Sequence, residues 1–99
     1  MMATFDEIIK SNNVVLVDFF ATWCGPCQTM APILQDVKEF YDESLSIIKI
    51  DVDKNPKIAA IYKVSGVPTF VLFKNGTQVW RQSGMITKAD LHKLIDSHK

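Results

Sequence analysis

An apolar run, a long amphipathic segment and a second apolar run follow one another in the first half of this 99-residue chain. The run over residues 14–20 is nearly continuous and rich in β-branched side chains, which is typical of a strand covered on both faces. Residues 26–41 carry apolar side chains at a helical period, and residues 46–51 form the next strand-like run. This order predicts a βαβ unit, with parallel strands and a right-handed crossover.

Shorter elements surround this unit. Thr4 and Glu7 have the spacing of a capping box, which predicts a short helix at the start of the chain. Residues 55–62 begin with Asn-Pro, an N-cap followed by a proline suited to the first helical position. Strand-like runs at 69–74 and 77–83 are joined by Asn-Gly, which favours a hairpin with a type I′ turn.

The complete pattern predicts one α/β domain over residues 1–99. Thr87 is expected to cap a last helix, and Pro32 is expected to kink the long one. The order αβαβαββα predicts a mixed four-stranded sheet with helices on both faces. No repeat, low-complexity tract or flexible linker divides the chain, and its length suits a single domain.

The composition excludes several classes of protein. Apolar residues make up 47% of the chain, which is too many for a disordered protein. Eleven basic side chains balance eleven acidic ones, so no basic field exists to attract nucleic acid. No apolar run approaches the ~20 residues of a membrane span. The N-terminus lacks the features of a signal peptide, so a cytoplasmic protein is expected, with the alternative that Met1-Met2 replaces a removed leader.

Two cysteines occupy the junction between the first strand and the long helix, in Trp23-Cys24-Gly25-Pro26-Cys27. A helix N-terminus carries partial positive charge and unpaired N–H groups, so the pKa of Cys24 is expected to lie below the ~8.5 of a free thiol. Cys24 is nearer the open end and is the expected attacking sulfur, with Cys27 as the resolving thiol. Gly25 permits a close approach, and Pro26 starts a helix without losing a needed N–H.

Paired cysteines have other uses. A zinc site needs four ligands, and the two histidines of the chain, His92 and His98, lie far from Cys27 in sequence. An iron–sulfur centre shared between two chains and two inert buried cysteines are the remaining alternatives. A Cys-x-x-Cys motif beside a βαβ pattern favours redox chemistry, so no metal is predicted.

Further stretches accompany the cysteine motif. They are residues 17–27, Ala31-Pro32, residues 51–53, 66–69 and 73–76, and Gly84. Together, in this order, they resemble the thioredoxin family over roughly residues 5–97. The resemblance implies the thioredoxin fold.

The resemblance also implies roles for individual residues. Cys24 matches the nucleophile and Cys27 the resolving cysteine of a redox-active disulfide. Asp18 matches a buried aspartate that helps Cys27 to lose its proton, a role suited to a desolvated carboxylate with a raised pKa. Lys49 on the neighbouring strand is expected to support the site. Pairing of Asp18 with Lys49 is the alternative interpretation of this aspartate and is compatible with proton transfer.

A substrate-binding surface is implied beside the cysteines. Pro68 matches a cis-proline, and Val67 would offer backbone groups to an extended substrate, as an added strand does. Asp53 is expected to orient Trp23. The surface is completed by Trp23, Gly66 and Gly84, for which turn chemistry and packing are the alternative interpretation.

The implied function is reduction of disulfides in partner proteins, as a general electron donor. The resemblance suggests recharging by a thioredoxin reductase that uses NADPH; the chain itself lacks the length and the glycine-rich fingerprint for a flavin or nicotinamide, so no bound cofactor is predicted. One alternative is a thiol oxidant or isomerase in an oxidising compartment, although Gly25-Pro26 resembles the reducing members. Another is a non-catalytic binding subunit or chaperone, against which both cysteines and Asp18 argue.

Three departures from the family pattern carry information. The chain begins at the first helix, so the extra N-terminal strand of longer thioredoxins is expected to be absent. Residues 46–51 would then form a sheet edge, and a monomer is expected with a weak dimer as the alternative. Gln28 stands where many relatives carry a cation, which weakens thiolate stabilisation. Phe20 replaces a common tryptophan and leaves Trp23 as the main fluorescent reporter.

Overall fold

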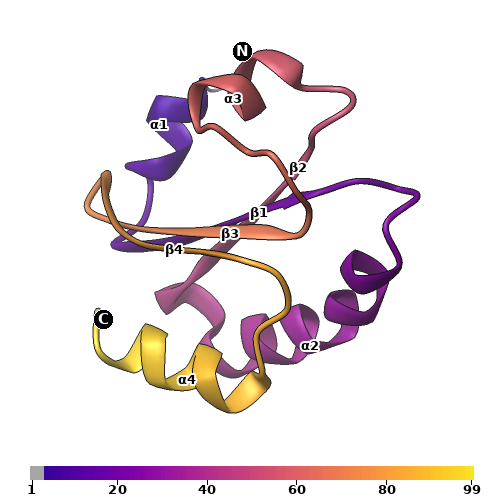
Figure 1. Cartoon of the computed structure of the whole chain (residues 1–99). Helices are drawn as coiled ribbons and strands as arrows, with labels where there is room; N and C mark the ends of the chain where they lie inside the picture. The colour runs from indigo at the N-terminus through magenta and orange to yellow at the C-terminus, as the bar shows by residue number, and fades with distance from the viewer. Residues whose placement is uncertain (1–3) are drawn as a thin grey trace.

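The computed structural model describes residues 4–99, which form a layered α/β structure (Figure 1). The predicted element order is confirmed. The elements are α1 (Phe5–Ile9), β1 (Val14–Phe20), α2 (Gly25–Tyr41), a 3-10 turn (Asp42–Ser44), β2 (Ser46–Asp51), α3 (Pro56–Ile61), β3 (Thr69–Lys74), β4 (Thr77–Ser83) and α4 (Lys88–Asp96). The long helix begins one residue earlier than predicted and continues through Pro32.

The four strands form one mixed sheet in the order β2-β1-β3-β4. β1 runs parallel to β2 and antiparallel to β3, and β4 pairs antiparallel with β3. Asn75 and Gly76 join β3 to β4 with φ angles of 51° and 81°, the positive values that a type I′ turn requires. The predicted fold, a mixed four-stranded sheet with helices on both faces, is therefore confirmed.

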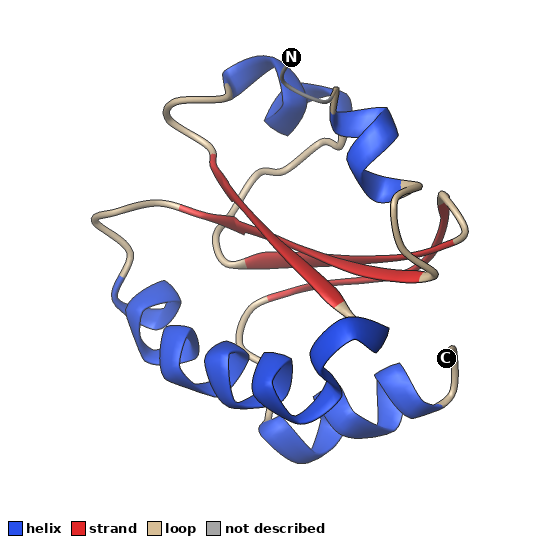
Figure 2. Ribbon diagram, turned by 180° about the vertical axis from the view of Figure 1, so that it is seen from behind, coloured by secondary structure: helices blue, strands red, loops and turns tan. Residues whose placement is uncertain are grey.

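Hydrophobic side chains of the sheet alternate between two helical layers. Val14 and Leu16 pack with residues of α2 and α4, whereas Val15, Val17 and Phe19 pack with residues of α1 and α3. This period of two is that of a strand covered on both faces. Seen from behind in Figure 2, the sheet lies between the two pairs of helices. Asp18 shares a strand face with Leu16 and therefore projects toward the α2 side.

Threonine side chains cap the first and the last helix. Thr4 accepts a hydrogen bond from the N–H of Glu7, and Thr87 accepts one from the N–H of Asp90, both at 3.1 Å, as predicted. Asn55 departs from its predicted capping role, because its amide donates instead to the carbonyl of Asp51 at 3.0 Å. That carbonyl lies at the end of β2, within reach of the side chain.

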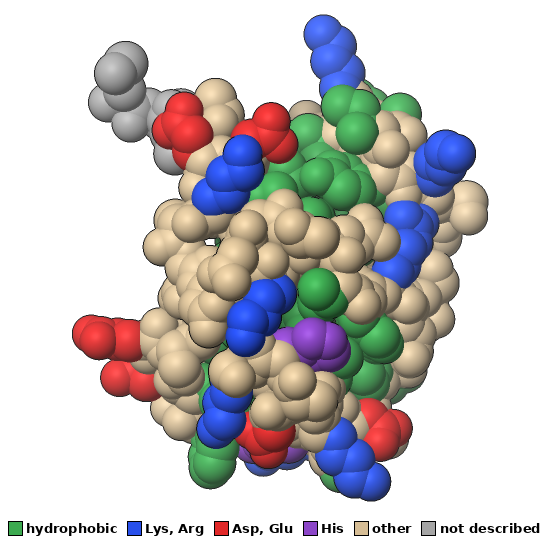
Figure 3. Space-filling view, turned by 90° about the vertical axis from the view of Figure 1, so that its left-hand side faces the viewer, with side chains coloured by type: hydrophobic (Ala, Val, Ile, Leu, Met, Phe, Trp, Pro, Cys, Tyr) green, Lys and Arg blue, Asp and Glu red, His purple; other side chains and the backbone are tan. Residues whose placement is uncertain are grey.

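Charges of both signs are interspersed on the face shown in Figure 3, in keeping with a formal net charge of zero. Within residues 4–99, no helix is both long enough and apolar enough to cross a bilayer.

Candidate active site

The two cysteines lie at the junction between β1 and α2. Cys24 is the N-cap residue of α2, and its Sγ accepts the N–H of Cys27 at 3.2 Å. The two residues are joined by a disulfide, with Cα atoms 5.3 Å apart. Pro26 occupies the first helical turn, where no N–H is needed. The sulfurs therefore sit at the positive end of the α2 dipole, which stabilises a thiolate in the reduced state.

The pair is mostly buried, since 4% of Cys24 and 7% of Cys27 is exposed. Ala21 completes the small cluster around the disulfide, and the half-buried Val52 and Val67 pack against it. Gln28 donates from its side-chain amide to the carbonyl of Thr22 at 3.1 Å. This bond ties the first turn of α2 to the loop that precedes it.

Asp18 is a buried carboxyl group on the central strand β1. Only 2% of the residue is exposed, and among the described residues its Oδ1 has no hydrogen-bond partner. Burial raises its pKa from 3.8 to about 6, although the positive charge of Lys49 acts in the opposite direction. The group therefore titrates close to neutrality, as predicted for a desolvated carboxylate.

Lys49 lies beside Asp18 in the parallel register of β1 and β2, where the alternative ion pair could form. No salt bridge joins the two residues in the described part of the chain. The ammonium instead lies 5.1 Å from the centroid of the Phe20 ring, at the edge of the sheet. A strongly hydrated ammonium loses more solvation by burial beside Asp18 than by lying over the half-buried Phe20 ring.

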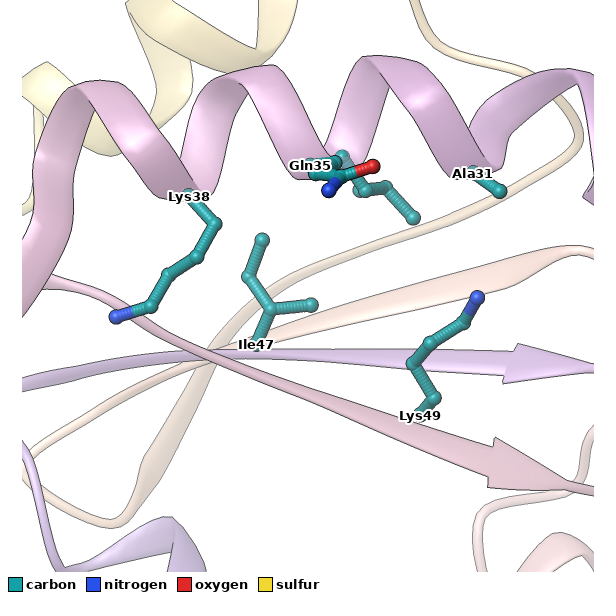
Figure 4. Close-up of a pocket in the computed structure, with 6 residues that line it drawn as sticks. Ala31, Gln35, Lys38, Ile47 and Lys49 are labelled. Carbon is teal, nitrogen blue, oxygen red and sulfur yellow. The ribbon is translucent and has the colours of Figure 1, made fainter.

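A cavity of about 310 Å³ opens between α2 and β2 on the Asp18 side of the sheet. Figure 4 shows the Lys49 side chain rising from β2 toward α2 at one end, with Lys38 at the other. The six lining residues are Ala31, Leu34, Gln35, Lys38, Ile47 and Lys49. The ammonium of Lys38 donates to the carbonyls of Asp42 and Leu45.

The loop before β3 forms a second wall of the site. The Val67–Pro68 peptide bond is cis, as predicted. The carbonyl oxygen of Val67 lies 3.7 Å from the Sγ of Cys24, the range of an S–H···O contact in the reduced state. Backbone groups of this loop therefore stand directly beside the sulfur that is nearer the open end of the helix.

Hydrogen bonds fix both sides of the cis-proline. The N–H of Gly84 donates to the carbonyl of Pro68 at 2.8 Å, and Gly84 has a φ of 94°, which side-chain-bearing residues rarely adopt. The hydroxyl of Thr69 donates to the carbonyl of Gly66 at 2.6 Å. The predicted surface residues Gly66, Val67, Pro68 and Gly84 are thus brought together by one connected set of contacts.

Trp23 forms the exposed rim of the site. The residue is 70% exposed, and its indole N–H donates to Oδ2 of Asp53 at 2.9 Å, the predicted contact. Asp51 Oδ1 in turn accepts the N–H of Asp53 at 2.9 Å. The Asp-Val-Asp stretch at the end of β2 therefore orients the tryptophan through its first and last residues.

A recess of about 120 Å³ lies next to this tryptophan. It is lined by Trp23, Val52, Val64, Ser65, Gly66 and Val67. Val52, Val64 and Ser65 were not among the predicted site residues. The position of Val52 between Asp51 and Asp53 could have indicated it, whereas no sequence motif marks Val64 or Ser65.

The two histidines belong to the C-terminal segment of the chain, at and after α4. His92 is half-buried, and its Nδ1 lies 3.0 Å from the hydroxyl of Tyr41. That hydroxyl also donates to Asp96 at 2.7 Å, so α2 and α4 are joined by polar contacts. Within residues 4–99 no three His, Cys, Asp or Glu side chains are arranged to hold a metal ion.

Known proteins share this sequence and this fold. The thioredoxin family model matches residues 1–97. A thioredoxin from Staphylococcus haemolyticus is 45% identical over 96 residues, which cover 97% of this chain and 91% of that protein. Thioredoxin Y of rice, a chloroplastic protein, is 46% identical over 96% of this chain, which spans 57% of the rice protein's length.

A solved structure extends the likeness to three dimensions. A mutant thioredoxin from Halobacterium salinarum NRC-1 is 41% identical and superposes with a TM-score of 0.89. The match covers 99% of this chain and 85% of that one. With the family model, the relatives and the Cys24–Cys27 pair in agreement, this chain belongs to the thioredoxin family of thiol–disulfide oxidoreductases.

Proposed function

We propose that this chain reduces disulfide bonds in partner proteins by dithiol–disulfide exchange. Thioredoxins in general act on protein disulfides and are themselves reduced by thioredoxin reductase. The observation that carries the proposal is the Cys24–Cys27 disulfide at the start of α2, beside the Val67 carbonyl. The oxidant and binding-subunit alternatives have no comparable support, because the relatives are thioredoxins and both cysteines are present.

Cys24 carries out the first step. Its thiolate attacks one sulfur of the substrate disulfide, a Cys24–substrate disulfide forms, and the other substrate sulfur leaves as a thiolate. The α2 dipole and the N–H of Cys27 favour the attacking thiolate. An extended substrate segment would lie along Val67, with Trp23, Gly66, Pro68 and Gly84 around it.

Cys27 carries out the second step. It gives its proton to Asp18, directly or through water, and its thiolate attacks the sulfur of Cys24. The mixed disulfide breaks, the Cys24–Cys27 disulfide forms, and the second substrate sulfur leaves as a thiolate. With a pKa of about 6, Asp18 is ionised in most molecules at neutral pH and is basic enough to accept the proton.

Regeneration would need two electrons from outside the chain. We propose that a thioredoxin reductase delivers them, and that the flavin and NADPH chemistry belongs to that partner. Recognition would again involve the surface around Trp23 and Val67, because the same disulfide must be reached.

The equilibrium potential of the Cys24/Cys27 pair tests this function. Trp23 fluorescence can follow the disulfide during titration against a thiol buffer. A potential of about −270 mV, the value characteristic of thioredoxins, is expected. A value of about −120 to −180 mV would instead indicate an oxidant or isomerase.

Trapping tests the order of the two steps. A Cys27→Ser variant should accumulate a mixed disulfide with an oxidised protein substrate, reversible by dithiothreitol. The matched Cys24→Ser variant should trap nothing, because Cys27 is one turn inside the helix. Equal trapping by both variants would contradict the assignment of Cys24 as the nucleophile.

A further inference from the structure

Arg81 occupies the α1–α3 side of the edge strand β4. Its register partner on β3 is Val71, which packs with residues of α1 and α3. Paired residues of an antiparallel ladder project from the same face, so the Arg81 side chain is directed toward the α3 side. Figure 1 shows α3 above the sheet on this side.

The guanidinium binds the turn that follows α3. One nitrogen donates to the carbonyl of Tyr62, and the other donates to the carbonyl of Lys63 at 2.9 Å. The carbonyls at the end of a helix have no partner within it, and a cation there is favourable. Lys63 has a φ of 54°, a conformation that is uncommon for a residue with a side chain. Arg81 therefore adds two side-chain hydrogen bonds to a turn of uncommon backbone conformation.

This turn leads directly into the wall of the active site. The N–H of Val64, one residue later, bonds to the carbonyl of Ala59 at 2.9 Å, and residues 64–67 then line the recess beside Trp23. The other end of the loop is held from the same strand, because the hydroxyl of Ser83 lies 3.1 Å from that of Thr69. Arg81 and Ser83 are two residues apart on β4, so both anchors lie on one strand face.

We propose that Arg81 is a positioning residue for substrate recognition, which fixes the 64–67 loop so that an extended polypeptide can bind along Val67. The inference rests on the proposed reductase function. When the loop is already ordered before the substrate binds, less conformational entropy is lost on binding. Attack on a small disulfide needs Cys24 but few contacts with the loop. Comparing the rates with a protein disulfide and with a small disulfide therefore separates an effect on substrate positioning from an effect on the chemical step.

Arg81→Gln removes both charge-assisted donors. With insulin as the protein disulfide, KM is expected to rise about tenfold, equivalent to about 1.4 kcal/mol, with kcat nearly unchanged. The rate with dithiobis(nitrobenzoate), a small disulfide, should change by less than about twofold. Arg81→Lys, which keeps the charge but not the fork of two donors, should give an intermediate KM.

Lys74→Gln is the matched control. Lys74 is also a strand cation, and its ammonium donates to the carbonyl of His98 at the end of α4, away from the 64–67 loop. The control should leave KM for insulin unchanged. Amide hydrogen exchange at Val64 should become faster in Arg81→Gln and not in Lys74→Gln, a readout that needs no disulfide chemistry.

An unchanged KM in a folded Arg81→Gln protein would overturn the inference, as would equal losses with insulin and the small disulfide. If Arg81→Gln does not fold, Arg81→Lys is measured in its place, and an unchanged KM for insulin in that variant would also overturn the inference. A wild-type chain inactive with both disulfides would refute the reductase function and this inference with it. An active wild type with unaffected variants would refute the role of Arg81 alone.

Discussion

Replacing Asp18 with asparagine is expected to stabilise the disulfide form of the protein at neutral pH and to change it little below about pH 4. Asparagine keeps the size of the side chain and removes its charge. In the wild type the carboxyl group is buried on β1, and its Oδ1 has no hydrogen-bond partner among the described residues. Ionisation of this group therefore opposes folding.

The size of the effect follows from the pKa. Between the usual 3.8 and the folded value of about 6, at about 1.36 kcal/mol per pH unit, the difference is about 3 kcal/mol. The folded pKa is raised, so the wild type is most stable while Asp18 is protonated and loses stability as the pH rises from about 4 to about 6. The difference in the free energy of unfolding between Asp18→Asn and the wild type should grow over that pH range and then remain constant.

Urea unfolding from about pH 3.5 to about pH 8 measures this difference, and the disulfide form is required so that neither cysteine titrates. Asp36→Asn is the control, since Asp36 is an exposed carboxylate paired with Lys88 and should stay within about 0.5 kcal/mol of the wild type. A stability difference for Asp18→Asn that does not vary with pH would refute the reasoning, as would a variant less stable than the wild type at pH 8.

Three further substitutions test particular contacts. Thr87→Ala removes the acceptor for the N–H of Asp90 and should destabilise the protein by about 1 kcal/mol in thermal unfolding, whereas Thr87→Ser should restore most of the loss. Tyr41→Phe removes the hydrogen bond that lowers the pKa of Asp96; its effect on urea unfolding should therefore be larger at pH 7 than at pH 3, and an equal effect would contradict the Asp96 contact. Asp53→Ala frees the indole of Trp23 and should lower its fluorescence anisotropy without changing the unfolding midpoint.

Local patterns were sufficient to predict the fold. The continuous apolar run of β1 predicted a strand buried on both faces, and its side chains do pack with both helical layers. Asn75-Gly76 predicted the hairpin, because both residues tolerate positive φ. The capping threonines, Thr4 and Thr87, marked two helix starts through hydrogen bonds to residues three positions later.

The sequence was less informative about which of several possible neighbours a polar side chain contacts. Asn55 was expected to cap α3, but its amide reaches back to the carbonyl of Asp51. Pairing of Lys49 with Asp18 was the alternative interpretation of that aspartate, but the Lys49 ammonium lies over the Phe20 ring. Such choices depend on three-dimensional distances that neither spacing nor periodicity encodes.

The position of Asp18 on the central strand explains why its proton affinity falls in a useful range. At an exposed site the carboxyl would keep a pKa near its usual value and would be roughly a hundredfold weaker as a base. Without the positive charge of Lys49, burial would raise the pKa further, and more of the group would be protonated at neutral pH. The parallel register of β1 and β2, which places these two residues side by side, therefore sets the base strength that the proposed second step requires. The destabilisation of about 3 kcal/mol is a large share of the 5–15 kcal/mol that stabilises a typical domain, and Asp18→Asn should recover it while slowing release of the mixed disulfide.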